Sequence, residues 1–491
     1  MSDGLPEGWA TTTLASLLIA LESGSRPRGG VRGISKGIPS IGGEHLNYDG
    51  TFDFSSVRYV PEEFANSMTK GRIRTNDILM VKDGATTGKT AFVDSSFPFS
   101  DAFVNEHVFI CRPTSLIEPR FLFRFLMSSV GQERILENFK GSAQGGINQS
   151  FAPNTELPLA PFSEQLRIAA KLEKLLGQVD ACQQRLARIP ALLKRFRQAI
   201  LAAACSGRLT ADWREKAHDE ELELIEPANP KVVVEVEEIL ETPAYWRWLP
   251  LHALCDPGRS VCYGVIKLGA EYPAGVPCLR TSDVKPLHID TADVKCIAPE
   301  VSGQYQRTLL RGGEVLVNVR GTLGGVAIVP ENLRGWNISR EVAIVPVEGV
   351  LSKFVAFWIA SMPSQLWLTG VAKGVAYTGI NIEDLRLLPI ALPSLPEQKE
   401  IVCRVEALFE LADQIEARHG KAQTYVGKLT LSMLTKAFRG ELVPTEAELA
   451  RAEGRTYESA LVLLERIRAN TPAPKTGQAL RRPRRGGRSS T

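Results

Sequence analysis

Apolar residues recur at alternating steps of three and four along residues 163–207, which read SEQLRIAAKLEKLLGQVDACQQRLARIPALLKRFRQAILAAACSG. This heptad pattern predicts a long helix that packs knobs-into-holes on a partner helix. Ser163 is the expected N-cap, Gly207 follows the expected C-terminus, and Pro190 is expected to kink the helix because it lacks an amide donor. A helix of about 65 Å needs a partner. The expected seam comprises Leu172, Leu175, Val179, Cys182, Leu186, Ile189, Leu193, Phe196, Ile200 and Ala203.

A second seam of the same length lies 233 residues further along the chain, and eight of its ten positions are apolar. Two such seams most simply pack on each other, although each could instead pack on its own globular domain. A histidine within the seam indicates a polar core position or a device that fixes the helix register, rather than a catalytic group. The second seam comprises Val405, Leu408, Ala412, Ile415, His419, Ala422, Val426, Leu429, Met433 and Lys436.

The repeat extends beyond the helices, because residues 1–160 have a counterpart in residues 240–393. Both halves show Pro-x-x-Trp, two short β runs, a helical segment (119–139 and 351–368) and Gly-Ile-Asn, in that order. Each half is expected to hold a mixed domain followed by a long helix, which is an α+β fold. The expected parts are a first domain (1–160), a first long helix (161–210), an acidic linker (211–240), a second domain (241–393), a second long helix (394–443), a terminal helix (444–470) and a basic disordered tail (471–491).

The composition is ordinary for a globular protein, with 44% hydrophobic residues and a net charge of +3. No apolar run approaches the roughly 20 residues of a membrane span, and the start MSDGLPEGWATTTL resembles no targeting sequence. These features predict a cytosolic protein whose eight cysteines are reduced, since no C-x-x-C occurs. Arginines crowd residues 481–488, either as a solvated end or as an arm that grips DNA.

The segment from Gly84 to Thr90 resembles a phosphate-binding P-loop but departs from its spacing. The motif needs a glycine where the sequence has Asp83. The residues that follow, AFVDSS, read as a strand rather than as the helix that would bind phosphate, so a turn between two strands is the better interpretation. Lys89 could still face a DNA phosphate. The sequence contains no serine-nucleophile motif, no zinc-binding motif and no dinucleotide-binding motif. We therefore expect no active site and no metal site.

Taken in order, these motifs resemble the DNA-specificity subunit of type I restriction-modification enzymes. Each motif is weak alone, but their order and duplication are specific, and they cover almost the whole chain. The chain departs from the pattern where its second half begins TPAYW and in its arginine-rich tail. The motifs are LPEGW (5–9), GGIN (145–148), LPLAPFSEQLRI (157–168), SGRLTADWR (206–214), TGIN (378–381), LPSLPEQKEI (392–401), FRGELV (438–443) and ESALVLLERIRA (458–469).

The resemblance implies two target-recognition domains separated by two long antiparallel coiled-coil helices, with internal pseudo-two-fold symmetry. Each domain would read one half of a bipartite, asymmetric site in double-stranded DNA, and the helices would set the spacer. Two modification subunits would dock on the long helices and bring S-adenosylmethionine for adenine methylation. The expected docking surface is the set of charged residues opposite the seams, which are Glu173, Lys174, Arg188, Glu406, Glu416 and Lys421. Restriction subunits would add steps that use ATP and Mg2+. The chain itself would carry no active site and bind no cofactor. The alternative left open is a coiled-coil scaffold, or a DNA-binding module of another defence system without restriction partners.

Base-reading side chains are expected on loops, where Arg, Lys, Asn and Gln can reach base edges or phosphates. The basic loop of the first domain is one candidate, with a merely solvated loop as the alternative. The asparagines of the Gly-Ile-Asn motifs could equally cap local turns. The DNA-binding candidates are Arg26, Arg28, Arg32, Lys36, Lys82, Lys89, Gln144 and Asn148 in the first domain, and Arg280, Arg320, Lys373, Tyr377 and Asn381 in the second.

Overall fold

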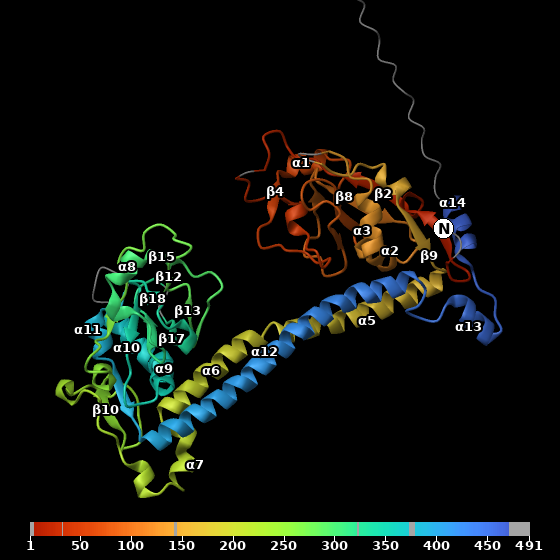
Figure 1. Cartoon of the computed structure of the whole chain (residues 1–491). Helices are drawn as coiled ribbons and strands as arrows, with labels where there is room; N and C mark the ends of the chain where they lie inside the picture. The colour runs from red at the N-terminus through yellow and green to blue at the C-terminus, as the bar shows by residue number, and fades with distance from the viewer. Residues whose placement is uncertain (1–3, 32, 142–144, 322–323, 373–378, 471–491) are drawn as a thin grey trace, which may run out of the picture. The chain divides into compact units, whose positions relative to one another are not determined.

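The chain divides into two compact units, the first of which joins segments that are distant in the sequence (Figure 1). Unit 1 comprises Met1–Arg185 and Ala422–Thr491, and unit 2 comprises Leu186–Lys421. Each unit therefore contains one globular domain and its own part of the long helices. The structure is a computed structural model that describes residues 4–31, 33–141, 145–321, 324–372 and 379–470.

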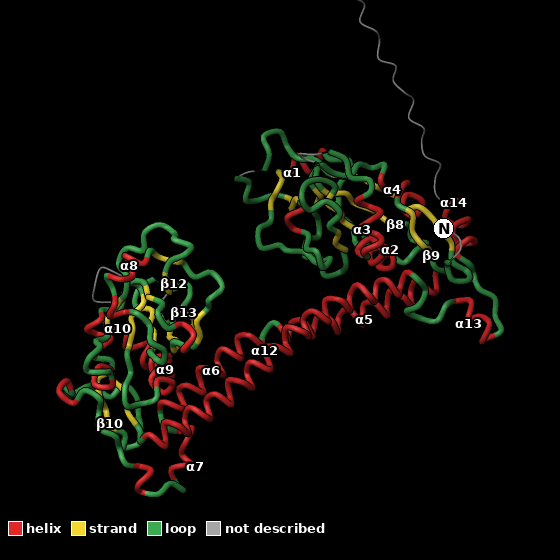
Figure 2. Tube along the Cα trace, in the orientation of Figure 1, coloured by secondary structure: helices red, strands yellow, loops and turns green. Residues whose placement is uncertain are grey.

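The core of unit 1 is a four-stranded antiparallel sheet with the order β2-β8-β5-β6. Its strands lie among many loops (Figure 2). Its Ile78 and Met80 face helix α2 (Pro119–Met127), whereas Leu79 and Val81 face a three-stranded sheet. This alternation is the two-residue period of a strand that is buried on both faces, which explains the continuous apolar run of β5. The strands are β2 (Leu18–Ser23), β8 (Val108–Pro113), β5 (Ile78–Val81) and β6 (Thr90–Phe92), then β4 (Arg58–Val60), β3 (Ile38–Ile41) and β7 (Phe103–Val104), with a separate pair β1 (Ala10–Thr13) and β9 (Glu156–Leu159).

Unit 2 repeats this topology strand for strand, as the internal sequence repeat predicts. The turn expected between two strands around Gly84 is confirmed in unit 1, where it joins β5 to β6. Unit 2 adds the pair β13 (Val284–Lys285) and β14 (His288–Ile289). Its other strands are β11 (Cys262–Tyr263), β19 (Val342–Val345), β16 (Val315–Asn318) and β17 (Val326–Ile328), then β15 (Cys296–Ile297), β12 (Val276–Leu279) and β18 (Asn337–Ile338), and the pair β10 (Arg247–Pro250) and β20 (Pro389–Leu392).

The helical segment expected in each domain is present as two helices with a serine between them. Ser128 ends α2 and caps the next helix, because its hydroxyl oxygen accepts a hydrogen bond from the amide of Gly131 at 3.1 Å. Ser361 occupies the same place in unit 2. The helices of the two domains are α1 (Glu62–Ser67), α3 (Ser129–Leu136), α4 (Phe151–Asn154), α8 (Pro299–Gly303), α9 (Ser352–Ala360), α10 (Met362–Ala372) and α11 (Ile382–Arg386).

The first long helix is interrupted rather than merely kinked. It forms α5 (Phe162–Leu186) and α6 (Ile189–Cys205), with a two-residue turn just before Pro190, whose missing amide cannot continue the ladder. The second long helix, α12 (Leu395–Phe438), is continuous. The single terminal helix expected over 444–470 is also wrong in detail, because Gly454 in a left-handed conformation separates α13 (Glu446–Glu453) from α14 (Ala460–Asn470).

Only one row of each expected seam is buried, and its members lie seven residues, or a multiple of seven, apart. Leu172, Val179, Leu193 and Ile200 form this row on α5 and α6. The prediction is wrong for Cys182, which is exposed, and for Phe196 and Ile415, which are each 36% exposed. An ideal two-stranded coiled coil would cover both rows, whereas here the second row stays partly open. The buried row on α12 is Val405, Ala412, His419 and Val426, while Leu175, Leu186, Ile189, Leu408, Leu429 and Met433 are half-buried.

Both packing alternatives for the seams hold, in different stretches. Near the middle the helices contact each other, as in unit 2, where Arg197 of α6 pairs with Asp413 and Glu416 of α12. Toward their ends the seams pack against the domains. In unit 1, Leu172 belongs to the hydrophobic cluster that also contains the buried side chains of α2. Val405 does the same in the core of unit 2.

The Pro-x-x-Trp and Glu-Gln motifs meet inside each unit. The indole of Trp9 donates a hydrogen bond to the buried Glu164 carboxylate at 2.9 Å, and Trp246 donates to Glu397 at the same distance. The adjoining Gln165 fastens the helix start to its domain by accepting from the amide of Glu118 at 3.0 Å. These motifs therefore lock each domain to its long helix.

The segment that follows each long helix also joins these locks. Arg214 of α7 (Ala211–Arg214) donates to Glu397 in unit 2, so the start of the expected acidic linker belongs to the core of that unit. In unit 1 the amide of Glu446 donates to Glu164 at 2.8 Å. The C-terminal helices thereby close unit 1 around its N-terminal segment.

Candidate nucleic-acid interface

Several loops of unit 1 converge at one end of the sheet β2-β8-β5-β6. The amide of Gly24, after β2, donates to Asn105 before β8 at 3.2 Å. The amide of Lys82, after β5, donates to the carbonyl oxygen of His107 at 2.9 Å, and the amide of Ile147 donates to that of Lys82 at 2.7 Å. We call this region, with its four loops, the loop end of unit 1.

The Gly-Ile-Asn motif is built into this loop end by packing. A side chain on Gly146 would place its Cβ 2.5 Å from the Lys82 carbonyl oxygen, so only glycine allows this approach. Ile147 is buried, and the Asn148 side-chain oxygen accepts a hydrogen bond from the amide of Ser150 at 2.9 Å. Asn148 therefore caps a turn, which is the second of the two roles considered for it from the sequence.

Arg26 is held at the loop end by an acidic cluster that the sequence did not reveal. Its Nε lies 2.8 Å from Glu106, and His107 lies between Glu106 and Asp83, with ring nitrogens 3.3 Å and 2.6 Å from their carboxylate oxygens. Because Nε is engaged, the guanidinium group is anchored while most of the side chain remains exposed. In the sequence, Glu106 and Asp83 are two acidic residues in separate loops, one before β8 and one after β5, and no local pattern links them.

The other candidates of unit 1 are distributed around the same loops. Arg28 and Lys36 are exposed on the loop after β2. Lys82 lies over the ring of Phe109, and Lys89 lies 4.7 Å from the ring of exposed Tyr48, so both lysines pack on aromatic faces. Arg32 and Gln144 lie outside the described residues.

Unit 2 has an equivalent loop end with different side chains. The amide of Val319, after β16, donates to Glu341 at 2.9 Å, and the amide of Ile380 donates to Val319 at 2.7 Å. Arg320 is exposed there, and Asn381 is exposed at the start of α11. Arg340, which was not among the candidates, lies just before β19 in this loop end. The strand register makes Arg340 the counterpart of Glu106.

Arg280 has a structural role in unit 2. It binds Asp283 and donates to the Asp293 carbonyl oxygen, and the hydrogen bond to Asp283 raises the pKa of the guanidinium group. Its charge is thus already matched by a neighbouring carboxylate. Lys373 and Tyr377 lie outside the described residues, as does the basic tail.

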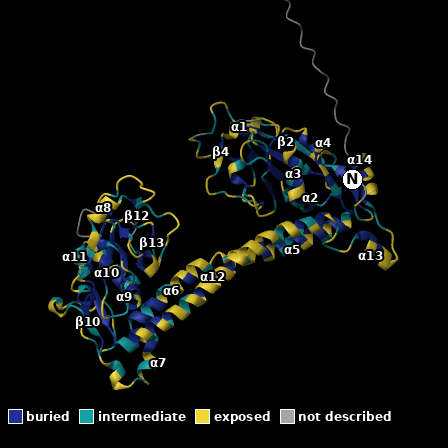
Figure 3. Ribbon diagram, viewed as in Figure 1, coloured by how far each residue is buried: buried dark blue, intermediate teal, exposed yellow. Residues whose placement is uncertain are grey.

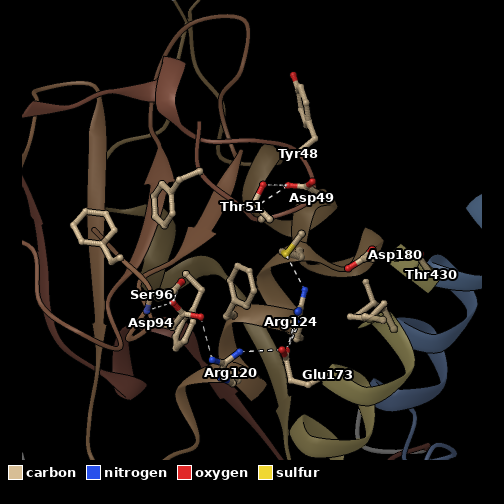
Figure 4. A pocket seen from close by; sticks show the side chains of 18 of the residues that line it. Tyr48, Asp49, Thr51, Asp94, Ser96, Arg120, Arg124, Glu173, Asp180 and Thr430 are labelled. Atoms are coloured by element: carbon tan, nitrogen blue, oxygen red, sulfur yellow. Dashed lines mark hydrogen bonds and ion pairs between the residues drawn. The ribbon is translucent and has the colours of Figure 1, made fainter. Parts of the chain in front are cut away.

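A second region of interest is a cleft of about 770 Å³ between the domain and the helices of unit 1 (Figure 4). Arg120 and Arg124 reach across it to Glu173 of α5, at 2.9 Å and 2.8 Å. Lys353 and Glu406 form the corresponding ion pair in unit 2. Arg120, Arg124 and Glu173 are therefore engaged with each other, and they fasten the domain to the helix.

The described part of the chain contains neither a cluster of metal ligands nor a membrane-spanning helix. No three His, Cys, Asp or Glu side chains gather there as possible metal ligands. No described helix is long and apolar enough to span a bilayer.

Comparison with known proteins agrees with the repeated architecture. The sequence model of the type I restriction modification DNA specificity domain matches residues 6–191 and 275–423. The specificity subunit of the type I restriction enzyme EcoBI from Escherichia coli is 37% identical over 335 residues, which is 67% of each chain. The corresponding subunit of EcoKI from Escherichia coli strain K12 is 28% identical over 98% of this chain and 100% of the relative.

Solved structures show the same fold. The HsdS subunit from Thermoanaerobacter tengcongensis has a TM-score of 0.54 at 21% identity, covering 89% of this chain and 98% of its own. A chain from a type I restriction-modification system has a TM-score of 0.61 at 19% identity, covering 89% and 99%. Together with the family match over both halves, these likenesses show that the chain belongs to the type I restriction-modification DNA specificity family, a family of specificity subunits and not of catalytic subunits.

Proposed function

We propose that this chain is the DNA-recognition subunit of a type I restriction-modification complex, and that each unit reads one half of a bipartite, asymmetric site in double-stranded DNA. The observation that carries this proposal is the loop end, which occurs in both units with the same backbone connections and different side chains. Two copies of one frame with different surfaces suit a site whose two halves differ in sequence.

Partner subunits would supply the chemistry in this proposal. Modification subunits would bring S-adenosylmethionine and methylate adenine, and restriction subunits would use ATP and Mg2+ for translocation and cleavage. The chain would bind none of these cofactors itself, and the complex would act in the cytoplasm. The long helices would set the distance between the half-sites.

An uncovered apolar face on the helices of unit 2 supports docking of a modification subunit there. Both α6 and α12 carry many exposed residues (Figure 3). Leu192 and Phe196 lie one turn apart on α6, and Leu411 and Ile415 lie one turn apart on the facing part of α12. The ion pairs of Arg197 with Asp413 and Glu416 place these turns of α6 and α12 next to each other. The four side chains are 36–51% exposed, and further helices laid on this face would complete the half-covered seam.

Three of the six charged residues first expected to form the docking surface are engaged within their own units. Glu173 binds Arg120 and Arg124, Glu406 binds Lys353, and Glu416 binds Arg197. The apolar face is therefore the better-supported docking surface. Charged residues around it would contribute to the choice of partner.

Exchange of one reading domain tests the proposal. The pairing of β1 with β9 brings the two ends of the domain together, so residues 14–155 can be replaced by the matching domain of a relative without disturbing Trp9 or Glu164. The chimera, co-expressed with the modification subunit of the host, should methylate sites in which only one half has changed. Changes in both halves would contradict the two-reader proposal, and a wild-type complex that selects no DNA sequence would favour a scaffold.

A further inference from the structure

The loop ends of the two units can be compared position by position. The last paired residues of the central strands are Val81 and Val108 in unit 1, and Asn318 and Val342 in unit 2. Two residues beyond them on each strand lie Asp83 and Glu106 in unit 1, and Arg320 and Arg340 in unit 2. Asp83 bridges to Gly146 of its Gly-Ile-Asn motif, as Arg320 does to Gly379. The backbone frame is therefore the same, and the charge at both positions is reversed.

The acidic positions of unit 1 are neutralised from within the unit. His107 lies between Asp83 and Glu106, and Arg26 binds Glu106. The carboxylate oxygens of Glu106 are shielded from solvent. Next to these two positions of unit 1, therefore, the guanidinium group of Arg26 is exposed, and Glu106 holds it in place.

The basic positions of unit 2 have no such partners among the residues that the structure describes. Arg320 and Arg340 are both exposed, and neither side chain makes a hydrogen bond or an ion pair there. The position corresponding to Arg26 is occupied by Ile266, which is 47% exposed. Like charges on adjacent strands repel each other, so an electron-rich ligand at this loop end would relieve the repulsion.

The reversal of charge argues for base edges rather than phosphates as that ligand. Two domains with one frame would present equivalent positions to equivalent parts of the duplex. A phosphate contact at these positions would favour cations in both units, whereas unit 1 carries Asp83 and Glu106 there. Positions that can carry either sign suit base edges, which present acceptors on guanine and donors on cytosine or adenine.

We infer that Arg320 and Arg340 read guanine in the half-site of unit 2, each through its terminal guanidinium nitrogens and the O6 and N7 acceptors of one guanine. This inference rests on the proposed function and assigns residues to it. Unit 1 lacks this pair of cations and presents anchored Arg26 instead, so the half-site of unit 1 should have a different arrangement of guanines.

Selection from random DNA tests the inference. The complex of this chain with its modification subunit is incubated with a library of random duplexes, and the bound molecules are sequenced. Arg340→Ala and Arg320→Ala should each lower the preference for guanine at one base pair of a single half-site, by about ten- to one-hundred-fold. Arg340→Gln should shift that preference toward adenine, because glutamine pairs with N6 and N7 of adenine.

Arg334→Ala is the matched control. Arg334 is an exposed arginine of the same domain that pairs with Glu331, beyond the opposite end of β16 and β17, and its loss should leave the selected sequence unchanged. The half-site of unit 1 reports correct folding and assembly within each experiment. Unchanged base preferences in the two alanine variants, with weaker binding to all sequences, would make these arginines phosphate contacts and overturn the inference. A wild-type complex that selects no sequence would instead overturn the proposed function.

Discussion

The ring nitrogen Nε2 of His419 lies 2.9 Å from the carbonyl oxygen of Leu186. In an uninterrupted helix that carbonyl would accept the amide of residue 190, but Pro190 has no amide hydrogen. The buried histidine of α12 therefore supplies the donor that the break between α5 and α6 leaves missing. The polar residue in the seam is thus matched to the proline on the facing helix.

Replacing this histidine should destabilise unit 2. In His419→Leu the Leu186 carbonyl would be buried without a donor, so we expect a loss of about 1–3 kcal/mol in the free energy of unfolding. Pro190→Ala provides a new backbone donor at residue 190. The double variant should recover part of the loss, and chemical denaturation of all four proteins measures the coupling. Strictly additive effects would show that the histidine does not serve this carbonyl.

The two glutamates of the unit 1 lock should respond to pH in opposite directions. Burial raises the pKa of Glu164 above its ordinary 4.5, although hydrogen bonds from Glu446 and Trp9 act the other way. Its favourable contribution is therefore complete below pH 4.5 and is lost as the pH rises through the folded-state pKa. Glu164→Gln should cost about 1–3 kcal/mol through a lost acceptor, and this deficit should shrink between pH 4.5 and 7.

Glu446 provides the comparison for this experiment. Burial opposes its ionisation, but the hydrogen bonds from Arg167 and Arg455 outweigh burial and lower the pKa. Its contribution is present above pH 4.5 and is lost as the pH falls through the folded-state pKa. Urea unfolding of Glu446→Gln should therefore show a deficit that grows from acidic to neutral pH. Parallel pH profiles for the two variants would contradict this assignment.

The uncovered apolar face can be tested without unfolding the chain. Because Phe196 and Ile415 are each 36% exposed, Phe196→Ser with Ile415→Ser should lower the free energy of unfolding by about 1–2 kcal/mol per site and leave the chain folded by circular dichroism. The same variant should lose co-purification with the modification subunit. Lys194→Asp is the control, since this exposed residue lies about 200° around α6 from Phe196. Retention of the partner at normal stoichiometry by the double variant would place docking elsewhere.

The motif order was sufficient to predict the repeat, the mixed domains and the long helices, because hydrophobic periodicity and turn residues are local signals. Local signals do not predict which seam residues are buried. Phe196 and Val179 both fit the heptad pattern, but Val179 is buried and Phe196 is exposed, because burial depends on how α5 and α6 pack against α12. The loop ends required pairing between distant strands, so Arg340 and the Arg26–Glu106 pair had no local signature. The break before Pro190 was underestimated because its compensating donor comes from the other helix.

The role of the helices as a spacer can be tested by lengthening both of them together. In unit 1 Leu176 of α5 and Leu434 of α12 share one core cluster, and Leu176, Asp180 and Thr430 line one cleft. Seven residues inserted after Gly177 therefore need a matching seven after Thr430, so that the buried row keeps its period on both helices. Each insertion adds about 10 Å of helix, which corresponds to about three base pairs of duplex at 3.4 Å per step. The methylated site should then keep both half-sites and gain about three base pairs between them.

An insertion in α5 alone breaks the match with α12 and should reduce stability, which provides the control for register. A folded, active double-insertion variant with an unchanged spacer would show that the helices do not set the distance.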